Sequence, residues 1–71
     1  MIETRKVKAR MILLGLTQPA VAEMMGINVA TFNQKLNNKR RIYVDEYIKL
    51  CEILKLETEE EQRELLGVAL I

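Results

Sequence analysis

Apolar residues recur along this chain at the spacing of amphipathic helices. Val7, Met11 and Leu14 follow one another at i, i+4 and i+7, and Phe32 and Leu36 lie one helical turn apart. Each set therefore falls on one helix face. Cap and turn residues separate the periodic segments. The pattern predicts five helices, at about residues 4–14, 17–25, 28–37, 44–55 and 59–68.

Local start and stop signals are clearest in residues 15–41. Thr17 can cap a helix that carries Pro19 in its first turn, where a missing N–H costs nothing. Gly26 follows the last periodic residue and can turn the chain with a positive φ. Asn28 offers a new N-cap two residues later. These signals predict two helices joined by a tight turn.

The second of these helices has two different faces. Phe32 and Leu36 point inward, together with Ile27 from the turn. An Asn or Gln amide can pair with adenine in a major groove, and Val or Ala can contact a thymine methyl group. The face left outward is short, uncharged and suited to such contacts: Val29, Ala30, Asn33 and Gln34.

Four short runs of residues carry a family resemblance. They are Leu16-Thr17-Gln18, Val21-Ala22, Met25-Gly26-Ile27-Asn28 and Thr31-Phe32-Asn33-Gln34-Lys35-Leu36-Asn37. This pattern resembles the helix-turn-helix of the phage Cro and C1 repressor family, also called the XRE family. With the flanking helices, the likeness covers about residues 5–56. It implies an all-α fold, a compact five-helix lambda-repressor-like DNA-binding domain.

The resemblance also implies roles for single residues. In the family, the glutamine at the position of Gln18 binds a DNA phosphate, the alanine at Ala22 packs against the second helix, and that helix reads bases. The chain departs from the family at two positions. Asn28 replaces a common Ser or Thr and can still cap, and Asn38 replaces a common Gly and can still adopt a left-handed conformation.

We expect two sets of DNA contacts from these positions. Lys39 and Arg40 follow the exit of the reading helix, although plain solvation is the alternative for both. Tyr43 stands where Ser or Thr would usually cap the next helix, which leaves its hydroxyl for solvent or a phosphate. The base-reading set is Val29, Ala30, Thr31, Asn33 and Gln34, and the phosphate-binding set is Gln18, Asn28, Lys39, Arg40 and Tyr43.

Length and composition narrow the function further. Seventy-one residues form a single domain, residues 1–71, near the lower limit for one apolar core. One cysteine and no histidine argue against a disulfide framework, a usual zinc site and Ser-His or Cys-His catalysis. We therefore expect that the protein is not an enzyme and that it has no catalytic residue, no metal and no cofactor. Cys51 is expected in the core, on an inward stripe of helix 44–55 with Val44, Tyr47, Ile48 and Leu54.

The net charge of +1 conceals a strong polarity. Residues 1–41 hold eight Lys or Arg residues and two acidic residues. Residues 42–71 hold three Lys or Arg residues and eight acidic residues. A surface that faces phosphates needs such local positive charge. Segregated charge is also common in helical proteins that bind no nucleic acid, so the polarity alone does not decide between the two.

The end of the chain is apolar. Thr58 and Glu61 have the spacing of a capping box, which predicts the start of the last helix. Residues 65–71 are then apolar except for Gly67. This is more apolar surface than a single helix can bury on so small a domain. The alternative is that Leu65, Leu66 and Val68 close the chain's own core. We expect a homodimer through this tail, with contacts from Leu65, Leu66, Val68, Leu70 and Ile71.

These features predict a sequence-specific double-stranded DNA-binding transcriptional regulator, a phage or mobile-element repressor of the Cro/C1 type. The two reading helices of a homodimer would lie about 34 Å apart on a near-palindromic operator. No small-molecule ligand is expected. No apolar run approaches the roughly 20 residues of a membrane span, so we expect no membrane partner and a cytoplasmic location.

Two other classes of function are compatible with the same fold. The chain could be a protein-interaction module, antitoxin-like or anti-repressor-like, that acts through its acidic and apolar C-terminal end. Single-stranded nucleic-acid binding is disfavoured because it needs exposed aromatic side chains for stacking. The chain has only Phe32, Tyr43 and Tyr47, and two of these are expected to be buried.

Overall fold

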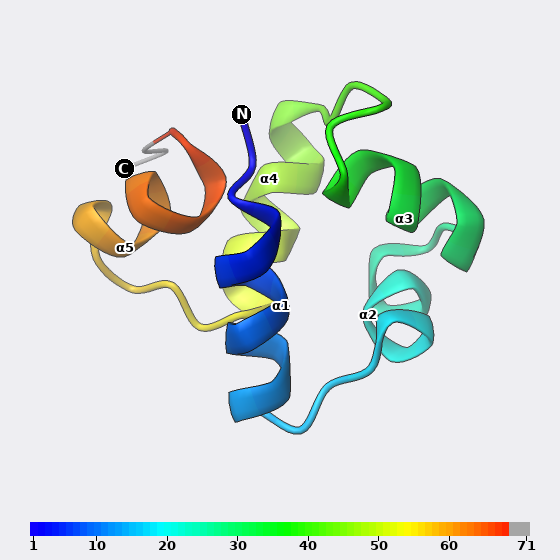
Figure 1. Cartoon of the computed structure of the whole chain (residues 1–71), viewed down its shortest axis with the longest axis horizontal. Helices are drawn as coiled ribbons and strands as arrows, with labels where there is room; N and C mark the ends of the chain where they lie inside the picture. Colours follow the sequence, from blue (N-terminus) through cyan, green and yellow to red (C-terminus); the bar gives the residue numbers. More distant parts are fainter. Residues whose placement is uncertain (69–71) are drawn as a thin grey trace.

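The computed structural model describes residues 1–68, which form five α-helices. They are α1 (Thr4–Leu13), α2 (Gln18–Met25), α3 (Val29–Leu36), α4 (Val44–Ile53) and α5 (Glu59–Leu66). α1 and α4 lie at the centre, with α2 and α3 on one side and α5 on the other (Figure 1). Residues 1–68 contain no strand, so the predicted all-α fold is confirmed. Within the same range, no helix is long and apolar enough to cross a membrane.

The helix starts follow the cap signals. The Thr17 hydroxyl accepts a hydrogen bond from the N–H of Ala20 at 3.3 Å, and the Asn28 side-chain oxygen accepts one from Thr31 at 2.8 Å. Thr58 caps α5 in the same way. Each helix begins one residue after its cap, because an N-cap residue keeps an extended backbone.

Four helices end earlier than the apolar pattern predicted. α1 ends at Leu13, α3 at Leu36, α4 at Ile53 and α5 at Leu66, one or two residues before the expected ends. Lys55 after α4 and Gly67 after α5 have φ values of 55° and 76°. A left-handed residue breaks the helical hydrogen-bond ladder, so apolar side chains beyond it do not extend the helix.

The core takes one face from every helix. Ala22 is 2% exposed and belongs to this core. Ile2, which precedes α1, is also buried. The largest fully buried side chains are Phe32, Leu36, Leu50, Leu54, Leu66, Val7 and Val21.

The buried face of α4 differs from the predicted one. Val44 is 64% exposed and Ile48 46% exposed, whereas Leu50 is fully buried. The prediction was wrong for Val44 and Ile48 because the core accepts the neighbouring stripe, which has equally good helical spacing. Val44 then projects from the first turn and Ile48 lies on the flank. The stripe that packs against the core is Tyr47, Leu50, Cys51 and Leu54.

The last turn of α5 packs into the core. Leu66 is fully buried and Leu65 is 9% exposed, while Val68 is 37% exposed. This corrects the expectation that Leu65 and Leu66 contact a second copy, because their side chains are enclosed by their own chain. Leu70 and Ile71 lie outside the described residues.

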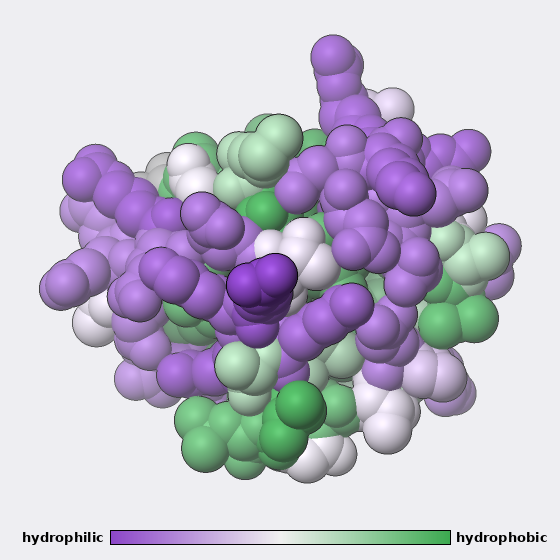
Figure 2. Space-filling model, viewed as in Figure 1, coloured by the Kyte–Doolittle hydropathy of each residue, from purple (hydrophilic) through white to green (hydrophobic). Residues whose placement is uncertain are grey.

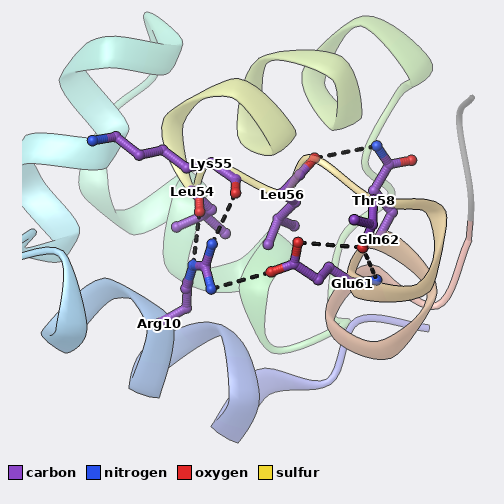
Figure 3. A network of polar contacts seen from close by, with 7 residues as sticks. All are labelled: Arg10, Leu54, Lys55, Leu56, Thr58, Glu61 and Gln62. Carbon is purple, nitrogen blue, oxygen red and sulfur yellow. Dashed lines mark hydrogen bonds and ion pairs between the residues drawn. The ribbon is translucent and has the colours of Figure 1, made fainter.

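Arg10 joins α1 to the end of α4 and to α5 (Figure 3). Its Nε donates to the carbonyl oxygen of Leu54 at 2.9 Å, and its Nη2 donates to that of Lys55 at 2.8 Å. Its Nη1 lies 3.3 Å from Oε2 of Glu61. The last carbonyls of a helix lack helical donors and carry partial negative charge. A cation counted in the basic half of the sequence is thus used to hold the fold together.

Several apolar areas interrupt a largely hydrophilic face, and one of them is prominent (Figure 2). It lies at the lower edge of the view, where α1 ends in Figure 1. Ile12 and Leu13 at this helix end are 78% and 75% exposed. The fold therefore leaves apolar surface exposed at the end of α1. The sequence pattern predicted an exposed apolar surface in residues 65–71 and none at this helix end.

Candidate nucleic-acid interface

α2 and α3 form a compact unit around a short turn. Gly26 has a φ of 74°, and a Cβ added there would meet no atom within 4 Å. Glycine is needed at this position for its backbone conformation rather than for space. The N–H of Ile27 donates to the carbonyl of Ala22 at 3.0 Å and closes the end of α2. The predicted helix-turn-helix geometry is therefore present.

α3 presents the predicted outward face to solvent. Phe32 and Leu36 are each 1% exposed and fix the inward face. Thr31 is partly exposed at the edge of the helix. An uncovered α-helix of this kind can enter a DNA major groove. The exposed positions are Val29, Ala30, Asn33 and Gln34.

Amide side chains are linked along this face. Nδ2 of Asn33 donates to Oε1 of Gln18 at 3.0 Å, which connects α3 to the start of α2. Nδ2 of Asn37 donates to Oδ1 of Asn33 at 3.2 Å and to its carbonyl oxygen at 2.9 Å. A side-chain amide has two N–H groups and two acceptor lone pairs. Asn33 is therefore oriented by its neighbours and keeps one donor and one acceptor position for a base edge.

Lys35 is a cation that the fold withdraws from the interface. Its Nζ lies 2.6 Å from both carboxylate oxygens of Glu46, and the residue is 6% exposed. Nζ also lies 5.3 Å from the centre of the Tyr43 ring, a favourable cation–π distance. The pair joins the reading helix to the first turn of α4.

The Glu46 carboxylate is stabilised in its charged form. Burial by itself raises the pKa of Glu46, but hydrogen bonds from Lys35 and from the N–H of Tyr43, together with the charge of Lys35, lower it below its ordinary value. The Tyr43 N–H donates to Oε1 of Glu46 at 2.9 Å. Glu46 is therefore ionised in the folded protein at neutral pH.

The cations that remain free lie mostly after α3. Within residues 1–68, ion pairs engage Lys6 with Glu64, Arg10 with Glu61 and Lys35 with Glu46. In the basic part of the sequence, the cations without an acidic partner in the described residues are Arg5, Lys8, Lys39, Arg40 and Arg41.

The loop after α3 brings its charge back toward the reading helix. Lys39, Arg40 and Arg41 are all exposed. Nη1 of Arg40 donates to the hydroxyl of Thr31 at 3.3 Å, so its guanidinium lies beside the first turn of α3. The charge of Arg40 therefore lies next to α3, the helix that carries the exposed amides of Asn33 and Gln34. Tyr43 lies two residues after Arg41 and is 58% exposed. Its contact with a phosphate stays a prediction.

Sequence reasoning missed the pairing of Lys35 with Glu46. Lys35 was counted only as one of the eight Lys and Arg residues of residues 1–41, yet it lies three residues after Phe32 and next to Leu36, both inward-facing. Helical spacing alone places it at the edge of the buried face. That position, with two acids in the first turn of the next helix, was the available signal.

A family model described as the Cro/C1-type HTH DNA-binding domain matches residues 6–60. The matched range contains α2, α3, α4 and most of α1, and it includes all the candidate DNA-contacting residues. Neither the curated proteins nor the solved structures give a match to the chain.

Proposed function

Because this chain belongs to the family of Cro/C1-type HTH DNA-binding domains, it is a DNA-binding regulator, and we propose that it is a sequence-specific transcriptional repressor of phage or mobile-element type. One observation carries the proposal. The exposed amides of Asn33 and Gln34 lie on α3, and the guanidinium of Arg40, from an exposed loop with three cations, lies beside the first turn of that helix. Amides suit base edges, and cations suit phosphates.

In the proposed mechanism, α3 enters the major groove by its N-terminal half. The loop after α3 and the start of α2 then lie against the phosphate backbone and fix the register. Asn28 uses its side-chain oxygen to cap α3 and keeps its N–H groups for a phosphate. Bases are contacted by Val29, Ala30, Thr31, Asn33 and Gln34, and phosphates by Gln18, Asn28, Lys39, Arg40 and Tyr43.

We further propose that two copies bind a near-palindromic operator. α3 has eight residues and is about 12 Å long, so it spans only a few base pairs. A second reading helix about 34 Å away multiplies these weak contacts. Val68 is exposed beside the end of α5, and with Leu70 and Ile71 it forms the proposed contact between copies.

Repression needs no catalytic step in this proposal. A bound dimer that covers a promoter excludes polymerase, and protein concentration alone sets its occupancy. No cofactor or small-molecule effector takes part.

Selection of bound sites from a random duplex library tests the proposal. The expected result is one motif with two related half-sites whose centres lie about one helical turn apart. Each half-site should contain adenines or thymines where the amides and the small apolar side chains of α3 are placed. An absence of binding to any duplex at micromolar protein and low salt would refute the proposal. That result would favour a protein-interaction module instead.

A further inference from the structure

Asn38 makes contacts that its backbone conformation does not require. Its φ of 62° is left-handed, which explains why glycine or asparagine suits the exit of α3. Its side chain does more. Oδ1 accepts from the N–H of Ile2 at 2.9 Å, and Nδ2 donates to the carbonyl oxygen of Ile2 at 2.9 Å. One amide thus pairs with both polar backbone groups of a residue 36 positions away.

Residues 2–4 are held against the exit of α3 by a second bond. The hydroxyl of Thr4 donates to the carbonyl oxygen of Leu36 at 2.8 Å. Leu36 is the last residue of α3, and its carbonyl has no helical donor of its own. The side chain of Ile2 is 3% exposed and packs in the core. Residues 2–4 are therefore a fixed support rather than a loose end.

The same segment is anchored to α5 on its other side. The N–H of Glu3 donates to the carbonyl oxygen of Leu65 at 2.8 Å. Gly67 lies so close to the backbone of Met1 that no side chain would fit. Residues 2–4 thus connect the end of α5 to the end of the reading helix.

The loop that follows Asn38 has few other restraints. Lys39, Arg40 and Arg41 are exposed and have no acidic partner within residues 1–68. The Lys39 N–H donates to the carbonyl of Gln34 at 2.9 Å, and the Arg40 side chain contacts Thr31. The chain turns away from α3 at Asn38, whose φ is left-handed.

We propose that Asn38 is a positioning residue for DNA binding. Its side-chain amide clamps residues 2–4 onto the exit of α3 and holds the loop of residues 39–41 in the orientation that phosphate binding requires. The inference rests on the proposed function. Without the clamp, the loop must be ordered during binding, and that ordering reduces affinity even though every phosphate contact is still made.

The variant Asn38→Gly isolates the side chain, because glycine adopts the left-handed conformation without strain. Binding is measured by fluorescence anisotropy on the duplex that the wild-type protein selects from a random library, at several salt concentrations. We expect N38G to bind about tenfold more weakly, equivalent to about 1.4 kcal/mol. The slope of log affinity against log salt should stay that of the wild type, because the same phosphates are contacted. Thr4→Val should weaken binding in the same direction.

Thr58→Ala is the matched control. It removes both hydrogen bonds of the Thr58 hydroxyl to Glu61 at the start of α5 and lowers stability without touching residues 2–4 or the loop. T58A should bind DNA as the wild type does at a temperature where both are folded. Thermal unfolding of all variants establishes that temperature.

Each result decides the matter. Wild-type affinity in N38G would overturn the inference and leave the proposed function intact. A salt slope reduced by about 1 would show that a cation of residues 39–41 no longer reaches its phosphate, which overturns the inference that every phosphate contact is kept. An equal loss in T58A would assign the effect to stability. If the wild-type protein selects no duplex, the proposed function fails and the inference falls with it.

Discussion

Replacement of Glu46 by Gln tests the buried pair that joins the reading helix to α4. The side chains of Lys35 and Glu46 are 7% and 16% exposed and lie 2.6 Å apart. The variant leaves the Lys35 ammonium buried without a counter-charge, which typically costs about 3–5 kcal/mol. The Gln amide oxygen can still accept from Tyr43 and Lys35, so we expect a loss of about 2–4 kcal/mol.

That loss is large for this chain. A domain of 71 residues has a total stability of about 4–11 kcal/mol. At about 4–8 °C per kcal/mol, the unfolding temperature should fall by about 10–30 °C. Urea and thermal unfolding at pH 7, followed by far-UV circular dichroism, measure both quantities.

The matched control is Glu59→Gln. Glu59 and Arg63 are also 2.6 Å apart, but their side chains are 51% and 67% exposed. An exposed pair of this spacing contributes about 0.5 kcal/mol or less. Each variant removes one carboxylate charge that lies 2.6 Å from a cation, and the buried pair is expected to lose far more stability than the exposed one. Equal losses in E46Q and E59Q would refute the reasoning.

The pH dependence adds a second criterion. The folded-state pKa of Glu46 is lower than its ordinary value, so the stability it contributes is present above about pH 4.3, the pKa in an unfolded chain. It is lost as the pH falls through the lower folded pKa. The stability curves of wild type and E46Q should therefore converge in acid. A constant gap down to the acid transition would contradict the assignment.

Four further substitutions test the interface, the turn and the proposed contact between copies. Gln34→Ala should cost about 1–3 kcal/mol of binding free energy and relax the preference at one base pair. Lys39→Ala should weaken the binding of all duplexes alike and lower the salt slope by about 1. Equal losses of affinity from both variants on every sequence would contradict this division. Gly26→Ala should destabilise by about 1–2 kcal/mol, because alanine is strained at a φ of 74°, and an unchanged urea midpoint would exclude such strain. Val68→Lys should weaken self-association in sedimentation equilibrium without loss of stability, since Val68 is exposed; an unchanged dimer would place the contact elsewhere.

Local signals in the sequence were sufficient for the reading unit. Thr17, Gly26 and Asn28 determine where α2 and α3 begin and end, because caps and left-handed turns depend on a few neighbouring residues. Helical spacing likewise separated Phe32 and Leu36 from the exposed amides. These features are properties of short segments.

Charge was predicted less well, because pairing depends on the folded chain. Lys35 and Arg10 counted as free cations in the sequence, yet both are engaged by acids or carbonyls from other helices. The sequence gives the number of charges on a segment. Only the packing of that segment decides which of them stay free for a phosphate.

The sequence by itself determined the helix-turn-helix, its caps and the uncharged outward face of α3, because those depend on residues within a few turns of one another. Tertiary structure alone decided that α4 buries Leu50 rather than Ile48, that Leu65 and Leu66 close the core, and that Asn38 grips Ile2. Each of these depends on how distant segments meet. Several arrangements satisfy the local pattern, and only one fills the shared core and pairs its buried polar groups.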